Sequence, residues 1–129
     1  MVGRGETVIV LDDLSTGFDW AVAGAAHLVV GDVGDVDLVR RLIEQHDITE
    51  IVHFAAKIVV PESVTYPLTY YLGNTVKTRA LFEAAIASGV KRLIFSSTAA
   101  VYGEPYVEVI PEATPTAPIN PYGRSKLMS

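Results

Sequence analysis

Residues 51–96 read IVHFAAKIVVPESVTYPLTYYLGNTVKTRALFEAAIASGVKRLIFS, and this stretch predicts a strand, a long helix and a second strand. The apolar, β-branched run Ile51–Ala55 suits a strand buried on both faces of a parallel sheet, and Arg92–Ser96 repeats the pattern. Between them, Pro67 fits the first turn of a helix whose alanine-rich end stops at Gly89. Strand, crossover helix and strand form a βαβ unit, so we expect neighbouring parallel strands.

The same alternation of strand and helix precedes this stretch. Two further apolar strands are predicted over Thr7–Asp12 and His27–Val30. Asp35 can cap a helix after the second strand, because the apolar residues that follow fall on one helical stripe. These residues are Val36, Val39, Leu42 and Ile43. The whole pattern predicts an α/β fold with a Rossmann-like, doubly wound parallel sheet.

Composition narrows the class of protein. The 129 residues, half of them apolar, predict one domain. With 10 Lys and Arg against 15 Asp and Glu, the net charge of −5 gives no electrostatic footprint for nucleic acid or an anionic membrane. The sequence has no cysteine, its longest apolar stretch is too short to span a bilayer, and its N-terminus lacks a secretory signal pattern. We therefore expect a cytoplasmic protein without nucleic-acid or membrane partners.

Ligands of doubly wound sheets bind beyond the carboxyl ends of the strands. Those ends carry Asp12-Asp13, Asp32-Val33, Phe54-Ala55-Ala56 and Ser96-Ser97-Thr98. A carboxylate such as Asp12 can accept both ribose hydroxyls of an adenosine and would repel a 2′-phosphate, which favours NAD over NADP. Alternatively, Asp12 or Asp13 only caps a turn before Gly17. The small Ala55 and Ala56 would admit a flat ligand but would equally suit packing.

The last segment of the chain carries the sharpest chemical signal. Asn120 and Pro121 provide an N-cap and a first-turn proline for a helix in which Tyr122 and Lys126, four apart, share one face. A tyrosine has an ordinary pKa near 10, and a neighbouring ammonium favours its phenolate, which could take a proton from a sugar hydroxyl. The hydroxyl of Thr98 could bind the same oxygen. A tyrosine and a lysine four apart also occur in many helices by chance, so the pair alone leaves a purely structural role open.

These residues resemble the extended short-chain dehydrogenase/reductase family over nearly the whole chain. The matching segments follow in family order and spacing: LDDLSTG at 11–17, GDVGD at 31–35, IVHFAA at 51–56, PESV at 61–64, PLTYY at 67–71, FSSTAAVYGEP at 95–105 and INPYGRSKLM at 119–128. The resemblance implies that Thr98, Tyr122 and Lys126 are catalytic, with Tyr122 as the base and Lys126 on the nicotinamide ribose. It also implies a set of NAD-binding residues, namely Asp12, Asp13, Asp32, Val33, Phe54, Ala55, Ala56, Asn74, Ser96, Tyr122 and Lys126.

The resemblance further implies a reaction. Related dehydratases carry an Asp-Glu acid/base pair where this chain has Ala99-Ala100, so elimination of water lacks its acid and base. What remains is NAD-dependent epimerisation at C4 of a UDP-hexose through a transient 4-keto sugar, which interconverts UDP-glucose and UDP-galactose and belongs to galactose metabolism. Alternatives are another nucleotide-sugar epimerase or reductase of the family, or a non-catalytic dinucleotide-binding module.

The sequence also departs from the family pattern. A glycine-rich phosphate loop is absent, because Gly3-Arg-Gly5 runs directly into a strand and better suits a helix C-cap. Gly73 stands where a second asparagine often accompanies Asn74, and Ile58 stands where some relatives carry a lysine. We therefore expect residues 1–129 to form a partial NAD-binding Rossmann domain, which lacks its first strand, its glycine-rich loop and the C-terminal substrate domain.

For most of the remaining polar and apolar residues, a structural role is a simpler interpretation than a functional one. His53 suits a hydrogen-bonded structural histidine, and Lys57 either reaches a phosphate or stays solvated. No grouping of His, Asp and Glu has metal-ligand spacing, so no metal is expected. The long helix could contribute to a homodimer of the full-length protein, as in the family, although core packing explains its apolar residues equally well. Those residues include Leu72, Val76 and Leu81.

Overall fold

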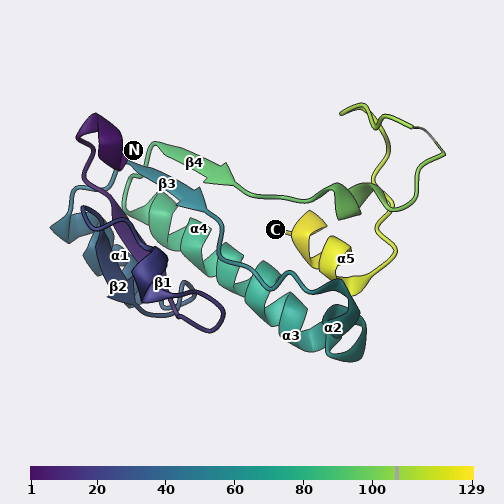
Figure 1. Cartoon of the computed structure of the whole chain (residues 1–129), viewed down its shortest axis with the longest axis horizontal. Coiled ribbons are helices and arrows are strands. Elements are labelled where there is room, and N and C mark those ends of the chain that lie inside the picture. Colours follow the sequence, from purple (N-terminus) through teal and green to yellow (C-terminus); the bar gives the residue numbers. More distant parts are fainter. Residues whose placement is uncertain (107) are drawn as a thin grey trace. The chain divides into compact units, whose positions relative to one another are not determined.

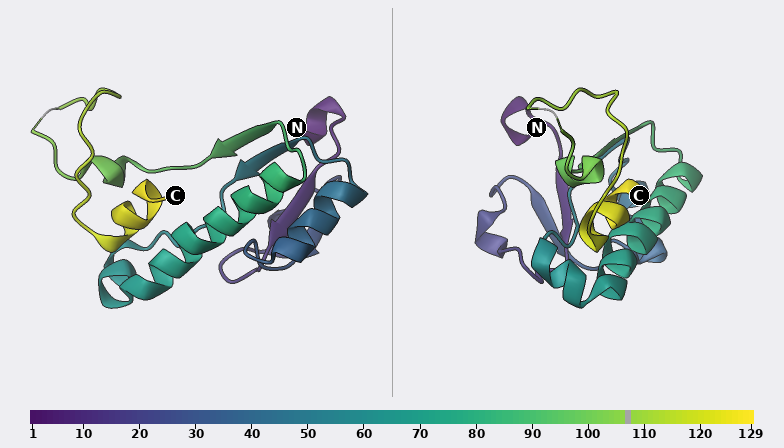
Figure 2. Two further views of the ribbon diagram at one scale, coloured as in Figure 1. Left: turned by 180° about the vertical axis from the view of Figure 1, so that it is seen from behind. Right: turned by 90° about the vertical axis from the view of Figure 1, so that its right-hand side faces the viewer.

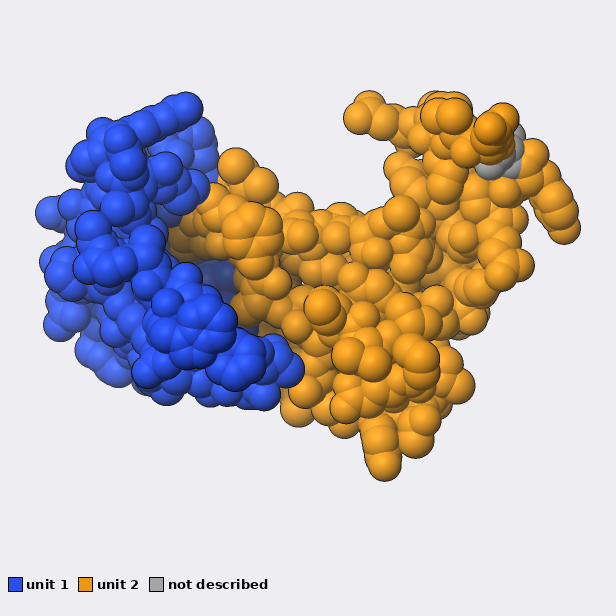
Figure 3. Space-filling model, viewed as in Figure 1, with its two compact units in different colours: residues 1–50, 80–92 blue, residues 51–79, 93–129 orange. Residues whose placement is uncertain are grey.

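A computed structural model of the chain describes residues 1–106 and 108–129. The described residues divide into two units, coloured separately in Figure 3. Unit 1 comprises residues 1–50 and 80–92, and unit 2 comprises residues 51–79 and 93–129. None of the described helices has the length and hydropathy that crossing a membrane requires.

Unit 1 contains the first two predicted strands. Strand β1 (Ile9–Asp12) pairs in parallel with β2 (His27–Val30), so that Ile9 lies opposite His27 and Asp12 opposite Val30. Both strands are confirmed, β1 starting two residues later than predicted. A short 3-10 helix, η2 (Asp19–Ala21), lies between them, and another, η1 (Val2–Arg4), precedes β1.

Helix α1 (Val36–Gln45) follows β2 and confirms the predicted amphipathic helix. The Asp35 carboxylate accepts a hydrogen bond from the Leu38 N–H at 2.9 Å, which is the expected N-cap. Val39 and Ile43, from the apolar stripe, are buried. Gly31 allows the close approach of strand and helix, because a Cβ there would lie only 2.4 Å from a methyl carbon of Leu38.

Strands β3 (Glu50–His53) and β4 (Arg92–Phe95) form a second, separate sheet (Figure 1). The Lys91 N–H donates to the Thr49 carbonyl at 3.0 Å, and the Ser96 N–H donates to the His53 carbonyl at 3.1 Å. The bonds advance in the same direction along both strands, so the pair is parallel. The described chain thus holds two two-stranded parallel sheets, as expected for an incomplete Rossmann-like fold.

The long helix starts at Pro67, as predicted, and contains an unexpected π-helical turn. It runs through α3 (Pro67–Tyr70), the π-helix η3 (Tyr71–Val76) and α4 (Lys77–Ala87) without a break, since the joining residues keep right-handed helical backbone angles (Figures 1 and 2). Gly89, with φ of +75°, follows its end. A further short helix, α2 (Val60–Thr65), precedes it and was not predicted. Because single π turns are frequent at functional sites, η3 is a candidate part of such a site.

Unit 2 ends with two short helices. Thr98 precedes the 3-10 helix η4 (Ala99–Tyr102), and α5 (Pro121–Leu127) is the predicted last helix. The Asn120 carboxamide oxygen accepts from the Gly123 N–H at 2.8 Å, which confirms the predicted N-cap. The intervening proline-rich segment includes Val107, which lies outside the described residues. The core of unit 2 includes the fully buried Tyr70.

Candidate active site

Asp12 is the last residue of β1, Asp13 follows it, and both side chains cap tight turns. Asp12 Oδ1 accepts from the Leu14 N–H at 2.7 Å, and Asp13 Oδ1 accepts from the Ser15 N–H at 2.9 Å. The turn-capping role that the sequence left open is therefore real. Gly17 packs closely against this turn. A Cβ at residue 17 would lie 3.0 Å from Asp12 Oδ1 and would crowd the carboxylate.

The turn hydrogen bond leaves acceptor positions of the Asp12 carboxylate unused. A carboxylate offers about four acceptor positions, and among the described residues only the Leu14 N–H donates a hydrogen bond to that of Asp12. No lysine or arginine of the described residues pairs with it, and no arginine follows within residues 13–17. The free acceptors fit the two hydroxyls of the adenosine ribose of NAD, and this turn supplies no cation for a 2′-phosphate.

Asp32 and Val33 lie at the same edge of the first sheet as Asp12. The Gly31 N–H donates to the Asp12 carbonyl at 3.0 Å, which continues the β1–β2 pairing just beyond β2. The exposed Asp32 caps its own turn, since its Oδ1 accepts from the Gly34 N–H at 2.8 Å. Unit 1 thus gathers Asp12, Asp13, Asp32 and Val33 at the carboxyl ends of two adjacent parallel strands.

Phe54, Ala55 and Ala56 follow β3 in unit 2. The Phe54 side chain is 72% exposed, Ala55 is exposed, and Ala56 is half-buried. Their backbone therefore lies at the surface just beyond a strand end, where the small alanines leave room for a flat ligand. Ser96, at the end of β4, is also half-buried.

Asn74 lies in the π-helical turn η3 and is 1% exposed. Its Oδ1 accepts from the Lys57 N–H at 2.8 Å, and its Nδ2 donates to the Lys57 carbonyl at 3.0 Å and to Ser125 Oγ at 2.9 Å. Both ends of the carboxamide are engaged within the chain. The sequence placed Asn74 near the cofactor, and the structure shows that its side chain is already used to join other segments.

Thr98 and α5 meet through a glycine. Thr98 Oγ1 accepts from the Ala100 N–H at 3.2 Å and so caps η4. A Cβ at Gly123 would lie 2.6 Å from the Ala100 carbonyl oxygen, so the backbone of α5 packs directly on η4. The glycine between Tyr122 and Arg124 therefore lets the helix that carries Tyr122 lie against the turn that Thr98 begins.

Tyr122 is half-buried and is supported by two buried residues. Its N–H donates to Ser63 Oγ at 3.2 Å, and its ring packs edge-on against Tyr70 with centroids 6.5 Å apart. The Tyr70 hydroxyl donates to Glu62 Oε2 at 2.6 Å. Burial, together with Glu62, raises the pKa of Tyr70 to about 12, so this phenol stays neutral beside Tyr122.

Lys126 is 4% exposed although it carries a charge. Its Nζ lies 4.4 Å from the centre of the Phe95 ring, a cation–π contact. Burial lowers the pKa of Lys126, because the charged form is poorly solvated there. In the described part of the chain no carboxylate pairs with this ammonium.

His53 occupies the interior beside this lysine and fits the predicted structural role. It is 3% exposed, its Nε2 lies 2.8 Å from Thr78 Oγ1, and its ring packs 5.7 Å from the Phe95 ring. Burial first, and then the charge of Lys126, lower the pKa of His53 to about 4. The ring is therefore neutral at pH 7 and adds no second cation near Lys126.

Two groups of predicted site residues are thus formed, one within each unit. Unit 1 holds the four at the ends of β1 and β2, and unit 2 holds the remaining ones. In unit 2, Thr98 precedes η4, and α5, which packs on η4, carries Tyr122 and Lys126 on one face. Among the described residues no group of three or more His, Cys, Asp or Glu could hold a metal ion.

The residues that support α5 were not predicted from the sequence; they are Ser63, Tyr70 and Ser125. Ser63 and Tyr70 contact Tyr122 across 59 and 52 positions of the chain, and no local pattern indicates such contacts. Ser125 had one available signal, because it lies between Tyr122 and Lys126 in the segment already singled out.

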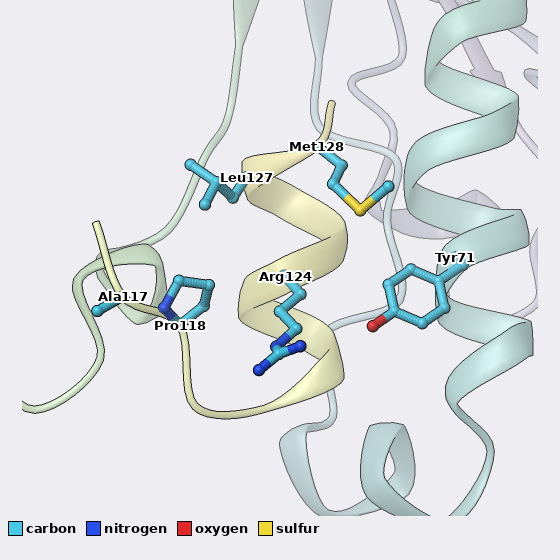
Figure 4. Close-up of a pocket in the computed structure, with 6 residues that line it drawn as sticks. All are labelled: Tyr71, Ala117, Pro118, Arg124, Leu127 and Met128. Carbon is cyan, nitrogen blue, oxygen red and sulfur yellow. The ribbon is translucent and has the colours of Figure 1, made fainter. Parts of the chain in front are cut away.

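The opposite side of α5 lines a different, open pocket of about 520 Å³ (Figure 4). Its lining residues are Tyr71, Ala117, Pro118, Arg124, Leu127 and Met128. At 100° per residue, Arg124, Leu127 and Met128 fall on the face of the helix opposite Tyr122 and Lys126. None of the predicted site residues lines this pocket.

Comparisons with known proteins show which family the chain resembles. The pattern of the NAD dependent epimerase/dehydratase family matches residues 1–129. A UDP-glucose 4-epimerase of Azospirillum brasilense is 47% identical over 129 residues, which are 100% of this chain and 37% of that protein. The chain therefore spans well under half the length of this curated relative.

Solved structures agree with the fold. The UDP-glucose 4-epimerase of Brucella ovis in complex with NAD superposes with a TM-score of 0.94 at 38% identity, covering 98% of this chain and 39% of that one. The UDP-glucose 4-epimerase of Bifidobacterium longum in complex with NAD+ and UDP gives a TM-score of 0.92 at 36% identity, covering 98% and 40%.

Proposed function

Because the chain belongs to the NAD dependent epimerase/dehydratase family, we propose that it is part of the cofactor domain of a UDP-hexose 4-epimerase. The reaction would interconvert UDP-glucose and UDP-galactose through a transient 4-keto sugar. One observation carries this proposal: α5 presents Tyr122 and Lys126 on one face and packs on η4, which Thr98 caps. The residues after Thr98 are Ala99 and Ala100, so no carboxylate stands there to eliminate water.

Each residue of this group has a distinct task. Tyr122, as phenolate, takes the proton from the sugar 4-hydroxyl and later returns it. Thr98 hydrogen-bonds the same oxygen and keeps it directed at Tyr122. Lys126, on the same face of α5 as Tyr122, would hydrogen-bond the nicotinamide ribose through its ammonium. The neutral His53 and Tyr70 fill the interior behind these groups without adding charge.

The residues at the strand ends would hold the cofactor. Asp12 would bind the adenosine ribose, with Asp13 beside it, and Asp32 and Val33 would border the adenine. Phe54, Ala55, Ala56, Asn74 and Ser96 would lie along the remainder, with Tyr122 and Lys126 at the nicotinamide end. When bound, NAD supplies the reversible acceptor for the hydrogen that leaves the sugar carbon.

Two further features belong to this proposal. A UDP-hexose epimerase works on a cytoplasmic metabolite, which agrees with a chain that has no cysteine. A homodimer of the full-length protein would use the exposed apolar side chains of the long helix, since Leu72 and Val76 are each 54% exposed. Leu81, at 5% exposure, belongs to the core instead.

A chimera tests the proposed reaction. In it, residues 1–129 replace the matched span of the A. brasilense enzyme, which supplies the parts of the protein that this chain does not contain. We expect the purified chimera to convert UDP-galactose to UDP-glucose, measured by chromatography of the nucleotide sugars. A folded chimera that binds NAD but leaves UDP-galactose unchanged would refute the proposed function.

Cofactor choice provides a second prediction. Because Asp12 places a carboxylate where a 2′-phosphate would lie, the cofactor-free chimera should bind NAD at least about tenfold more tightly than NADP. Replacing Asp12 with asparagine should narrow that ratio, since the repulsive charge is lost while the shape remains. Calorimetric titration with both dinucleotides measures the ratio. Equal or tighter binding of NADP to the unsubstituted chimera would show that Asp12 has another role.

A further inference from the structure

Helix α5 spans only seven residues, Pro121–Leu127, which is too short to be stable without tertiary contacts. Its position is therefore set by the groups that hold it. On one side Gly123 packs on the Ala100 carbonyl, as described above. At 100° per residue, Ser125 faces away from Gly123, so a second support must act on the Ser125 side.

Ser125 is fully buried, and its side chain is hydrogen-bonded in two directions. Its Oγ donates to the Tyr122 carbonyl at 2.8 Å and accepts from Asn74 Nδ2 at 2.9 Å. Its own carbonyl accepts from Thr75 Oγ1 at 2.9 Å. One serine thus joins the last turn of α5 to two consecutive residues of the π-helical turn η3.

The other end of this connection is also fixed. Asn74 holds the backbone of Lys57 through the N–H and the carbonyl, just after the strand end that carries Ala55 and Ala56. The π turn aims Asn74 and Thr75 together at Ser125, although they are neighbours in sequence. A chain of hydrogen bonds therefore runs from the segment after β3, through η3, to the helix that carries Tyr122 and Lys126.

We propose that Ser125 is a positioning residue that fixes Tyr122 and Lys126 through its hydrogen bond with Asn74. This role rests on the proposed function, because it gives Tyr122 and Lys126 a reaction to position for. Ser125 itself does not touch the substrate: it sets the rotation and height of α5 against η4. A misplacement of about 1 Å in such a site can cost a hundredfold in rate, whereas binding of the remote parts of a substrate changes little.

The test compares variants of the active chimera. Ser125→Ala should lower kcat at least about tenfold and change KM for UDP-galactose by less than about twofold. Ser125→Cys keeps a weak donor and acceptor at similar size and should recover part of kcat. Ser88→Ala is the matched control, because the Ser88 hydroxyl has no hydrogen bond in the described part of the chain. It should leave both constants unchanged.

A double-variant cycle shows whether Ser125 acts through Asn74. Asn74→Asp removes the Nδ2 donor but keeps the acceptor for the Lys57 N–H. If the two residues act as one unit, the double variant should be no more than about twofold slower than the slower single variant. Fully multiplicative losses would overturn the coupling.

The outcomes separate this role from the reaction itself. An inactive unsubstituted chimera refutes the proposed function, whatever Ser125 does. An active chimera whose Ser125→Ala variant keeps the unsubstituted kcat overturns the positioning role. Should Ser125→Ala not fold, Ser125→Cys decides: a kcat per folded molecule at least about twofold below the unsubstituted value supports the positioning role, and an equal kcat overturns it, with the folded fraction measured by circular dichroism. A loss of stability with an unchanged kcat per folded molecule also overturns the positioning role.

Discussion

Replacing Tyr122 with phenylalanine in the chimera should lower kcat for epimerisation at least about a hundredfold, the low end of what a general base contributes. The variant removes only the phenolic oxygen. The ring can keep its edge-on contact with Tyr70, and the backbone N–H of residue 122 keeps its bond to Ser63. The loss should therefore reside in the proton transfer and not in folding. Steady-state rates with UDP-galactose and the thermal midpoint of unfolding measure the two effects.

Thr98 supplies the control for this prediction. Thr98→Ser retains the hydroxyl and should keep most of the activity, whereas Thr98→Val removes it at the same shape and should not. The valine variant also loses the bond from the Ala100 N–H that caps η4. Comparison of the two therefore requires that both melt cooperatively. A Tyr122→Phe enzyme within a few-fold of the unsubstituted rate would remove Tyr122 from the role of base.

Local patterns predicted the elements that local interactions determine. Asp35 caps α1 and Asn120 caps α5, because a side-chain oxygen satisfies a backbone N–H only a few residues away. The four strands follow from apolar runs, and Pro67 marks the start of the long helix. The spacing of Tyr122 and Lys126 likewise places both on one face of α5, since four residues make about one turn.

Those local patterns could not predict long-range contacts. The π turn η3 exists where Asn74 and Thr75 bond Ser125, some 50 residues further along the chain. Nothing in the local sequence distinguishes this turn from an ordinary helical one. The hydrogen bonds of Asn74 could not be predicted from local patterns either. The sequence associated Asn74 with the cofactor, and in the structure its side chain is hydrogen-bonded to Lys57 and Ser125.

The 129-residue chain by itself should show no measurable affinity for NAD, even though it carries the predicted cofactor residues. Its described strands form two separate two-stranded sheets, β1 with β2 and β3 with β4. An isolated two-stranded sheet is marginally stable in water, and its open edges expose unpaired backbone groups. The predicted NAD residues are divided between the two units, so neither unit carries the complete set.

The phosphates of NAD would also lack their usual support in the isolated chain. Dinucleotide-binding folds hold the pyrophosphate on a glycine-rich loop at the N-terminus of a helix, and no such loop occurs among residues 1–129. Calorimetric titration should therefore detect binding of NAD to the chimera, because the A. brasilense enzyme supplies the glycine-rich loop and its helix. The same titration of the isolated chain should detect no binding at millimolar NAD. A micromolar dissociation constant for the isolated chain would mean that residues 1–129 build a complete dinucleotide site without a glycine-rich loop.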